Sequence, residues 1–397
     1  MATEKLYWKD AFATEVEARV VAVAEWKGAP SVVLDRTVFY PEGGGQLGDR
    51  GALVVGEASV PVVDVQVDED GRIHHLLAAP WAHGEATVRG AIEVARRRDF
   101  MSQHTGQHLL SAALAVVCKG ETVSSRLGAE SSTIDLDLVT LDPRALADAE
   151  ALVNERVLAD LDVVVTFPTS DELRALPLRR APKVSEGIRV VTVAGLDCSP
   201  CGGTHCARTG QVGWVHATST ERYKGGTRVT FLAGARAHAD AARKEAVLRD
   251  LARELTCGVL DVGAAVGKLR GDLRSKTDAF AATRGELLRL VAERVHRERP
   301  PKAGPTRIVL HREQEDLGGL RSLAAALAAR PDVIAFVGAR DPEKGDLLVV
   351  VERGSGVTEF DCGKWFKERL ARGARGGGRP ERAEGRLPPS MSLEEET

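Results

Sequence analysis

Residues 235–299 divide the chain into two parts. They contain no proline, and Ala, Leu, Arg and Glu recur at helical spacing, with an interruption around TCGVLDVG. This pattern predicts a helical hairpin that acts as a spacer over residues 235–302, ending in the linker RPPKAGP at 299–305. Dimerisation through a coiled coil is an alternative use of the same segment. Because 397 residues suffice for two to four domains, we expect folded parts on both sides.

The part before the spacer begins with strands. Over residues 1–95, β-branched residues are broken at short intervals by Gly, Pro and Asp, which predicts a small all-β barrel or sandwich, and we favour the barrel. From about residue 96 the pattern changes to helical spacing in DFMSQHTGQHLLSAALAVVC. Strand-like and helical runs then alternate up to Gly234. We therefore predict an α+β domain over residues 96–234.

After the spacer, the sequence pattern predicts a small α/β domain over residues 303–390. Strands TRIVLH, VIAFVGA and DLLVVVE are separated by the helical runs GGLRSLAAALAAR and CGKWFKERLAR. We expect GARGGGRPERAEG to be a loop and the tail SMSLEEET to be disordered. The fold class is thus α+β multidomain.

Charge, hydropathy and cysteine content limit the class of protein. The net charge of −3 excludes a generally basic nucleic-acid-binding protein, so nucleic-acid contacts must be local. The sequence has neither a membrane-length apolar run nor an N-terminal signal pattern, so we expect a cytoplasmic protein without membrane contact. In that compartment, six cysteines favour metal or thiol chemistry over disulfides.

Two short motifs predict a metal site. His104 and His108 stand four apart in the predicted helix, which places both imidazoles on one face. Cys201 and His205 have the same spacing in LDCSPCGGTHCARTG. Together they supply three nitrogen ligands and one sulfur ligand, a set that suits one Zn²⁺ ion.

Other uses of the cysteines remain open. A local site could use Cys198, Cys201, His205 and Cys206, but adjacent residues rarely both face one ion. A redox pair is a further alternative, although Gly-Gly after Cys201 fits a tight loop better than a helix start. Four protein ligands are typical of structural zinc, whereas catalytic zinc keeps an open position. Sequence alone leaves both roles open.

The motifs resemble those of a known family. HTGQHLL and CGGTH are similar to the zinc motifs of the alanyl-tRNA synthetase editing domain and of the free-standing AlaX editing proteins. RTVFYPEGGGQLGDRG resembles the glycine-rich motif of the larger AlaX forms, and GARGGGRPERAEG resembles a loop of the synthetase's DHH-associated C-terminal domain. Ala374 stands where a second glycine is common, and Cys198 and Cys206 have no assigned role.

The resemblance implies a function. It implies a zinc-dependent hydrolase that acts in trans on mischarged tRNA(Ala), chiefly Ser-tRNA(Ala) and secondarily Gly-tRNA(Ala). Only about 95 residues precede the segment that resembles the editing domain, so we expect no aminoacylation. A non-catalytic tRNA-binding protein with a structural zinc is the alternative, and a zinc hydrolase for a small ester or peptide, unrelated to tRNA, is a third hypothesis. A homodimer through the helical or C-terminal domain is also expected.

Candidate catalytic residues surround the predicted metal ligands. Gly202 and Gly203 would let backbone N–H groups approach an oxyanion. Thr105 lies between the two histidines and supplies a hydroxyl. By resemblance, Gln46 lies in the motif beside the editing site, and Thr37 of the same motif is expected to bond the hydroxyl of a serine substrate.

Candidate tRNA contacts lie in two regions. Their basic side chains suit phosphates, and their glycines allow close backbone approach. The residues are Arg97, Arg98, Arg222, Lys224 and Arg228 near the predicted site, and Arg375, Gly376, Gly377, Gly378 and Arg379 in the C-terminal domain.

Overall fold

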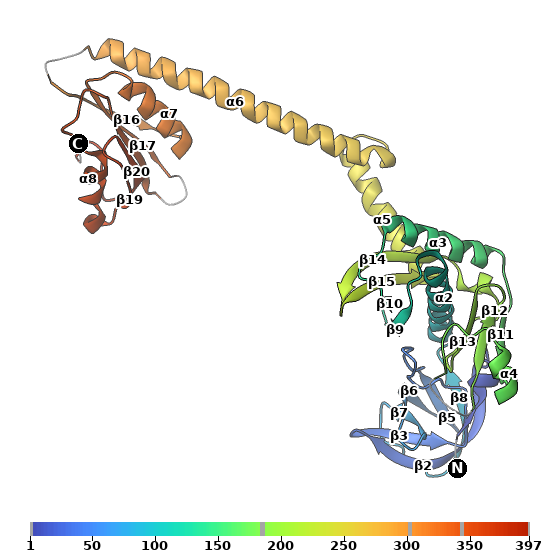
Figure 1. Cartoon of the computed structure of the whole chain (residues 1–397). Coiled ribbons are helices and arrows are strands. Elements are labelled where there is room, and N and C mark those ends of the chain that lie inside the picture. Colours follow the sequence, from blue (N-terminus) through green and yellow to red (C-terminus); the bar gives the residue numbers. More distant parts are fainter. Residues whose placement is uncertain (1–2, 183–186, 301–303, 342–344, 396–397) are drawn as a thin grey trace. The chain divides into compact units, whose positions relative to one another are not determined.

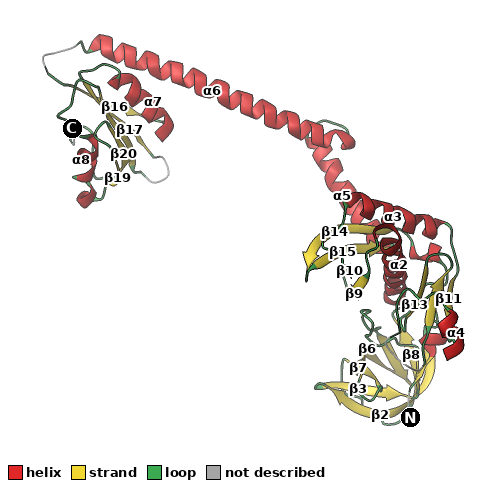
Figure 2. Cartoon of the chain, in the orientation of Figure 1, coloured by secondary structure: helices red, strands yellow, loops and turns green. Residues whose placement is uncertain are grey.

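The computed structural model describes residues 3–182, 187–300, 304–341 and 345–395 (Figure 1). The chain divides into two compact units, Met1–Asp250 and Leu251–Thr397. Both units combine helices and strands (Figure 2). The expected α+β multidomain class is therefore confirmed, whereas the division into four domains stays a prediction. No helix in the described ranges combines the length and apolarity needed to cross a membrane.

The first unit begins with a closed six-stranded barrel. Its strands are neighbours in the order β2 (Glu15–Trp26), β3 (Ala29–Leu34), β7 (Ile73–Leu77), β6 (Ala58–Val67), β5 (Gly51–Val55) and β8 (Thr87–Ile92). Apolar residues alternate along the strands and fill the interior, as in the buried positions of β2. Short elements precede and join the strands: β1 (Glu4–Lys5), α1 (Leu6–Lys9) and β4 (Arg36–Thr37). The predicted barrel is confirmed.

The helix α2 (Val94–Cys118) runs through the rest of the first unit and contacts strands of two sheets. One sheet has the order β14 (Val215–Tyr223), β15 (Gly226–Ala233), β10 (Ser132–Leu136) and β9 (Thr122–Leu127). The other has the order β11 (Val163–Thr166), β12 (Val190–Val193) and β13 (Asp197–Pro200). Helices α3 (Pro143–Leu158) and α4 (Ser170–Ala175) and the 3₁₀ helix η1 (Thr209–Val212) complete this part.

Local chemistry sets the ends of these helices. The Asp142 side chain caps α3 by accepting the Arg144 N–H, and Pro143 occupies the first turn, where its missing N–H is no loss. The α2 helix ends at Lys119, whose φ of 58° lies in the left-handed region. Most residues of α2 between Phe100 and Leu114 are buried, because the helix is packed on several sides.

An internal ion pair joins the barrel to α2. Arg97 is only 1% exposed, and its guanidinium binds Asp49 as well as the carbonyl oxygens of Ala11 and Val38. This corrects the prediction that Arg97 contacts tRNA: its donors are used inside the protein. The glycine-rich loop of the barrel also binds β9, since the Leu127 N–H donates to the Gly45 carbonyl at 2.7 Å.

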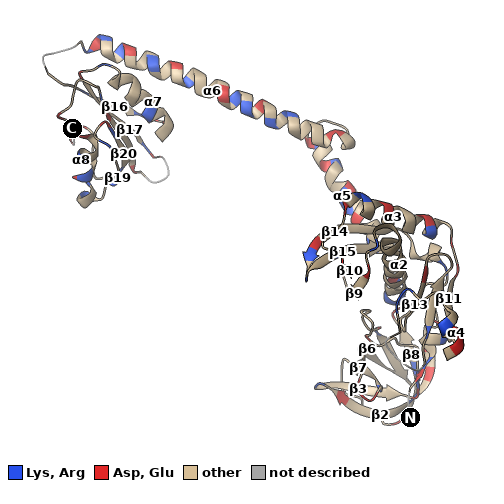
Figure 3. Cartoon of the chain, in the orientation of Figure 1, with Lys and Arg blue, Asp and Glu red and all other residues tan. Residues whose placement is uncertain are grey.

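Two helices occupy the proline-free segment. They are α5 (Ala235–Glu254) and α6 (Val262–Glu298), separated by a break that includes the 3₁₀ helix η2 (Val259–Asp261), at the predicted interruption. Charges of both signs are spread along α6 (Figure 3). Because α5 and α6 belong largely to different compact units, the hairpin packing stays a prediction. Part of the predicted linker, residues 301–303, lies outside the described residues.

The second unit contains a five-stranded mixed sheet. Its order is β16 (Thr306–Arg312), β17 (Val333–Arg340), β18 (Leu347–Arg353), β20 (Arg382–Leu387) and β19 (Arg375–Gly378). Helices α7 (Leu317–Ala328) and α8 (Cys362–Lys367), with the 3₁₀ helix η3 (Leu370–Arg372), complete it, and α6 packs on α7 through Leu288, Ala292 and Val295. Only β16 and β17 are parallel.

Two expectations for this unit were wrong. The segment expected to be a glycine-rich loop forms the paired strands β19 and β20. Part of the tail that was expected to be disordered is packed, because Met391 and Leu393 are buried in the core beside α8. Apolar side chains at two alternate positions suffice to anchor this short segment.

Candidate metal centre

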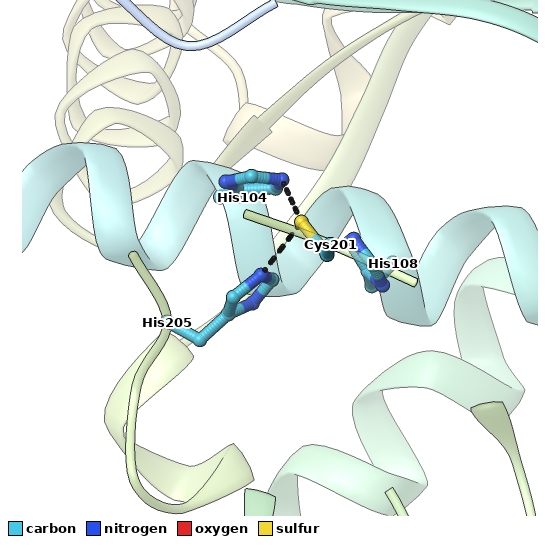
Figure 4. Close-up of side chains that lie close together, drawn as sticks. All are labelled: His104, His108, Cys201 and His205. Atoms are coloured by element: carbon cyan, nitrogen blue, oxygen red, sulfur yellow. Dashed lines mark hydrogen bonds between the residues drawn. The ribbon is translucent and has the colours of Figure 1, made fainter. Parts of the chain in front are cut away.

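The four predicted ligands meet at one point. His104 and His108 project from successive turns of α2, and Cys201 and His205 lie on the loop after β13 (Figure 4). Their ligand atoms all lie within 4.8 Å of one another. Cys201 Sγ is 3.3 Å from both His104 Nε2 and His205 Nε2. Two ligands of a tetrahedral zinc ion stand about 3.6 Å apart, so this spacing suits such an ion.

Each histidine is held through its other ring nitrogen. His104 Nδ1 lies 2.8 Å from Gln46 Oε1, His108 Nδ1 lies 2.7 Å from Asp197 Oδ2, and His205 Nδ1 lies 3.2 Å from Thr105 Oγ1. These bonds leave Nε2 of each ring for the centre, as is usual for histidine ligands. His108 Nε2 is buried and has no hydrogen-bond partner among the described residues. A metal ion would supply the missing partner of this nitrogen.

The electrostatics also suit a cation. Burial opposes ionisation of the Cys201 thiol, but the charges of His104, His205 and His108 outweigh it and hold the pKa well below the usual value. Burial likewise opposes ionisation of Asp197, yet its bonds to His108 and Arg179 lower the pKa of this carboxyl. A thiolate beside three imidazoles is a typical zinc donor set.

The hairpin of β12 and β13 positions half of the centre. Val193 pairs with Asp197 and Val190 with Pro200, so Asp197 begins the second strand and Cys201 follows its end. The two other cysteines of this region point elsewhere. Cys198 accepts a hydrogen bond from Thr192, and Cys206 lies in the core. The alternative local site with Cys198 and Cys206 is therefore not formed.

The predicted catalytic residues have different positions. Gln46 and Thr105 are buried and hold ligand rings, and Gln46 also binds Thr204 through its side chain. A side chain at Gly203 would overlap the His104 ring, so the glycine is required by this close approach. The Gly203 N–H points to Cys201 Sγ at 3.5 Å, which argues against its predicted oxyanion contact. Gly202 is exposed.

Thr37 lies away from this point. It is buried in the barrel, where its hydroxyl is 2.8 Å from His75 Nε2 and accepts the Phe39 N–H at 3.0 Å. It does not line the cleft beside the metal ligands. The predicted contact between Thr37 and a serine substrate is not formed by this arrangement.

A cleft of about 700 Å³ opens beside the centre. The barrel, α2, β9 and the segment before β12 all contribute to its wall. Among the described residues, its charged lining is mainly basic, with three cationic side chains and one carboxylate, which favours an anionic ligand. The lining includes Lys5, Trp8, Glu42, Gly43, Gly44, Gly45, His104, Arg180, Arg189, Cys201, Gly202 and Gly203.

A second cleft of about 1010 Å³ continues from the first, because residues 123–125 line both. Lys224 and Arg228 line it, as does Arg126. Arg228 is bound to Asp135 at 2.6 Å. The remaining basic residues predicted in this unit are exposed outside both clefts: Arg98 and Arg222.

The predicted tRNA contacts of the second unit lie on the edge strand β19, apart from Arg379, which follows it. Arg375, Arg379, Gly376 and Gly378 are exposed, and Gly377 is half-buried. Side chains at Gly376 or Gly378 would collide with β20, and Gly376 has a φ of 152°. These glycines are therefore required by strand pairing, whatever else they contact.

Sequence reasoning missed two residues of the centre. Asp197 holds His108, and a carboxylate four positions before a cysteine ligand is the signal that could have indicated it. Arg189 donates to two carbonyl oxygens of the loop that carries Cys201. No local pattern marks Arg189, because its contacts depend on how β12 and β13 pair.

Comparisons with known proteins agree with the motifs. A model of tRNA synthetases class II (A) matches residues 5–94, and a model of the threonyl and alanyl tRNA synthetase second additional domain matches residues 188–230. Among solved structures, the C-Ala domain from Aquifex aeolicus alanyl-tRNA synthetase is 20% identical and covers 24% of this chain and 88% of that one, with a TM-score of 0.22. That likeness is too weak to support a conclusion.

Curated relatives carry two names. An alanine–tRNA ligase of Halorubrum lacusprofundi is 32% identical over 99% of this chain and 43% of its own length. One of Halobacterium salinarum is 40% identical over 59% of this chain and 26% of its own length. The alanyl-tRNA editing protein AlaX-L of Pyrococcus horikoshii is 34% identical over 62% of this chain and 61% of its own length. The chain thus spans less than two thirds of each of these relatives. It is similar to part of the alanine–tRNA ligases and to part of AlaX-L, as its motifs predicted.

Proposed function

We propose that this protein is an aminoacyl-tRNA deacylase that hydrolyses mischarged tRNA(Ala), chiefly Ser-tRNA(Ala) and secondarily Gly-tRNA(Ala). The observation that carries this proposal is the His/Cys cluster at the wall of a basic cleft, beside the glycine-rich loop. A purely structural metal needs no adjoining cleft. The similarity to AlaX-L supports the same reaction.

We propose Zn²⁺, one ion per chain, as the metal. His104, His108, Cys201 and His205 would hold it, and the buried Nε2 of His108, which has no hydrogen-bond partner among the described residues, fits this role. Bound zinc acts as a Lewis acid toward a carbonyl oxygen or lowers the pKa of a bound water.

The chain's own residues supply orientation. Gln46, Asp197 and Thr105 fix the three imidazole rings. The cleft would take the 3′ end of the tRNA with its aminoacyl ester, and Gly202 retains a backbone N–H at the wall for the acyl oxygen.

Contacts to the body of the tRNA are proposed on three surfaces: Lys224 and Arg228 in the second cleft, the exposed Arg98 and Arg222, and the edge strand Arg375–Gly378 with Arg379. A homodimer through the helical segment is proposed as well, since α6 exposes large apolar residues such as Leu269, Leu273 and Phe280.

Ester loss tests the proposal. Purified protein is incubated with Ser-tRNA(Ala), Gly-tRNA(Ala) and Ala-tRNA(Ala), beside a His104→Ala, His108→Ala variant. A His216→Ala, His238→Ala variant is the matched control, because it removes two histidines of the same unit that lie outside the cluster. We expect rapid loss of the serine ester with wild type and control only, with the alanine ester spared. If no ester is lost while tRNA and zinc stay bound, the protein is a tRNA-binding protein with a structural zinc.

A further inference from the structure

Three consecutive carbonyl groups of the metal-binding loop are held from outside the loop. Arg189 Nη1 donates to the carbonyl oxygens of Cys201 and Gly203, each at 2.8 Å. Between them, Trp8 Nε1 donates to the Gly202 carbonyl at 3.0 Å. We call Arg189 and Trp8 the carbonyl clamp. Trp8 belongs to the short helix before the barrel, so two distant segments fix one stretch of backbone.

Fixing a carbonyl also fixes the N–H on the other side of its peptide. In a planar trans peptide the C=O and the following N–H point in opposite directions. Accordingly, the Gly203 N–H points to Cys201 Sγ at 3.5 Å, and the Thr204 N–H points to Gln46 Oε1 at 3.2 Å. Both acceptors belong to the metal centre or support it. The clamp therefore determines the direction of these donors.

The peptide that joins Cys201 to Gly202 differs from the next two in what its N–H can bind. Its carbonyl, on Cys201, is bound to Arg189, so the Gly202 N–H must point away from the guanidinium. Among the described residues, this N–H donates to no protein group. Gly202 is exposed and lines the cleft beside the metal ligands. The clamp thus leaves one oriented donor for a ligand in the cleft.

Arg189 is an unusual residue for this task. It is only 4% exposed, and none of the ion pairs within the described ranges includes it. A buried cation is stable only where acceptors replace its lost water. Here the acceptors are loop carbonyls, and the Arg189 carbonyl in turn accepts the Cys201 N–H at 2.9 Å. Its main bonds are therefore to the metal-binding loop.

We propose that Arg189, assisted by Trp8, is a positioning residue for the ester hydrolysis. It orients Cys201 Sγ toward the other metal ligands and presents the Gly202 N–H to the acyl oxygen of the substrate. This role rests on the proposed function, because the oxygen in question is that of the aminoacyl ester. Neither residue touches the reacting atoms itself.

The test combines a spectrum with kinetics. Arg189→Met removes the guanidinium donors and keeps an unbranched stem, Arg189→Lys restores a cation, and Arg180→Met is the matched control. Arg180 lines the same cleft, but no bond joins it to the loop carbonyls. Each variant is loaded with Co²⁺, and the thiolate-to-cobalt absorption band reports the geometry at Cys201. Deacylation of Ser-tRNA(Ala) by the zinc form gives kcat and KM.

We expect Arg189→Met to bind one cobalt per chain with a shifted thiolate band and to lose about 100-fold in kcat, the loss typical of a misplaced oxyanion donor, with KM little changed. Arg189→Lys should recover part of the wild-type band position and part of kcat. Arg180→Met should keep the wild-type spectrum. A wild-type band and kcat in Arg189→Met would overturn the proposal.

A second variant guards against misfolding. Trp8→Phe removes the N–H that binds the Gly202 carbonyl and keeps a smaller aromatic ring at this half-buried position. It should shift the thiolate band in the same direction, with a smaller loss of kcat. An unchanged band and kcat in this variant would also refute the clamp. If wild type hydrolyses no ester, the proposed function fails, whereas the cobalt spectra still test the positioning of Cys201.

Discussion

Replacing Asp197 by Asn tests whether the carboxylate behind His108 controls metal binding. Asp197 is 4% exposed, and its Oδ2 lies 2.7 Å from His108 Nδ1. Its Oδ1 accepts hydrogen bonds from Arg179 Nε at 2.7 Å and from Ser199 Oγ at 2.8 Å. Asn keeps the shape of the side chain, but it has no charge, and its amide nitrogen can only donate. Asn must therefore lose either the contact with His108 or the contacts with Arg179 and Ser199.

The substitution should lower both the zinc affinity and the free energy of unfolding, by different amounts. Partners of histidine ligands contribute about 10- to 100-fold to metal affinity, which corresponds to about 1.4–2.7 kcal/mol. The substitution also leaves the guanidinium of Arg179, whose side chain is 11% exposed, without its carboxylate. Breaking a buried ion pair on one side reduces the free energy of unfolding by about 3–5 kcal/mol. We expect the apoprotein to lose stability and the folded protein to bind zinc more weakly.

Competition with a chromogenic chelator measures zinc affinity, and urea unfolding of the apoprotein measures stability. Asp135→Asn is the matched control, because Asp135 accepts from Arg228 Nε and Ser124 Oγ, each at 2.6 Å, without a histidine partner. It should lose stability and keep its zinc affinity. Wild-type zinc affinity in Asp197→Asn, or an equal loss in the control, would refute the reasoning.

Three further outcomes follow from particular contacts. Gly203→Ala should abolish zinc binding, measured by equilibrium dialysis, because its Cβ overlaps the His104 ring, whereas Gly202→Ala should bind zinc normally, because its Cβ meets only ordinary contacts. Arg97→Met should reduce the free energy of unfolding by about 3–5 kcal/mol in urea and leave tRNA affinity unchanged; weaker tRNA binding by the folded variant would restore the surface role. Burial lowers the pKa of His75 to about 4. The unfolded chain therefore binds the extra proton first, and stability should fall by up to about 1.4 kcal/mol per pH unit as the pH drops from about 6.5 to 4, a slope that His75→Gln should reduce.

Local patterns predicted the barrel, α2 and the four residues of the His/Cys cluster that could hold a metal ion. Alternating and helical periodicities are carried by neighbouring residues, and the HxxxH and CxxxH spacings bring their own geometry. The same helical period also predicts that Arg97 is buried, although we expected it to contact tRNA. It stands seven residues before His104, on the same face of α2, so its burial followed from the helical period that places the ligands.

Other features could not be predicted from neighbouring residues. Asp197 and Arg189 act through the pairing of β12 with β13 and through contacts with distant segments. Thr37 was assigned a substrate contact by resemblance, yet the barrel directs its hydroxyl to His75. A glycine-rich stretch likewise does not reveal whether its glycines serve a loop or a strand, and Gly376 and Gly378 serve a strand.

Gln46 lies on the glycine-rich loop of the barrel, yet it binds His104 of α2 and Thr204 of the loop after β13. The barrel therefore contributes to the candidate metal centre and is not an appendage to it. A fragment that begins after Ile92 would keep all four ligands and lose the group that orients one of them. Recombination that separates these segments would yield a chain with the correct motifs and a defective centre. We therefore expect the residues from the barrel through β15 to be inherited together, and a domain transplant to need all of them.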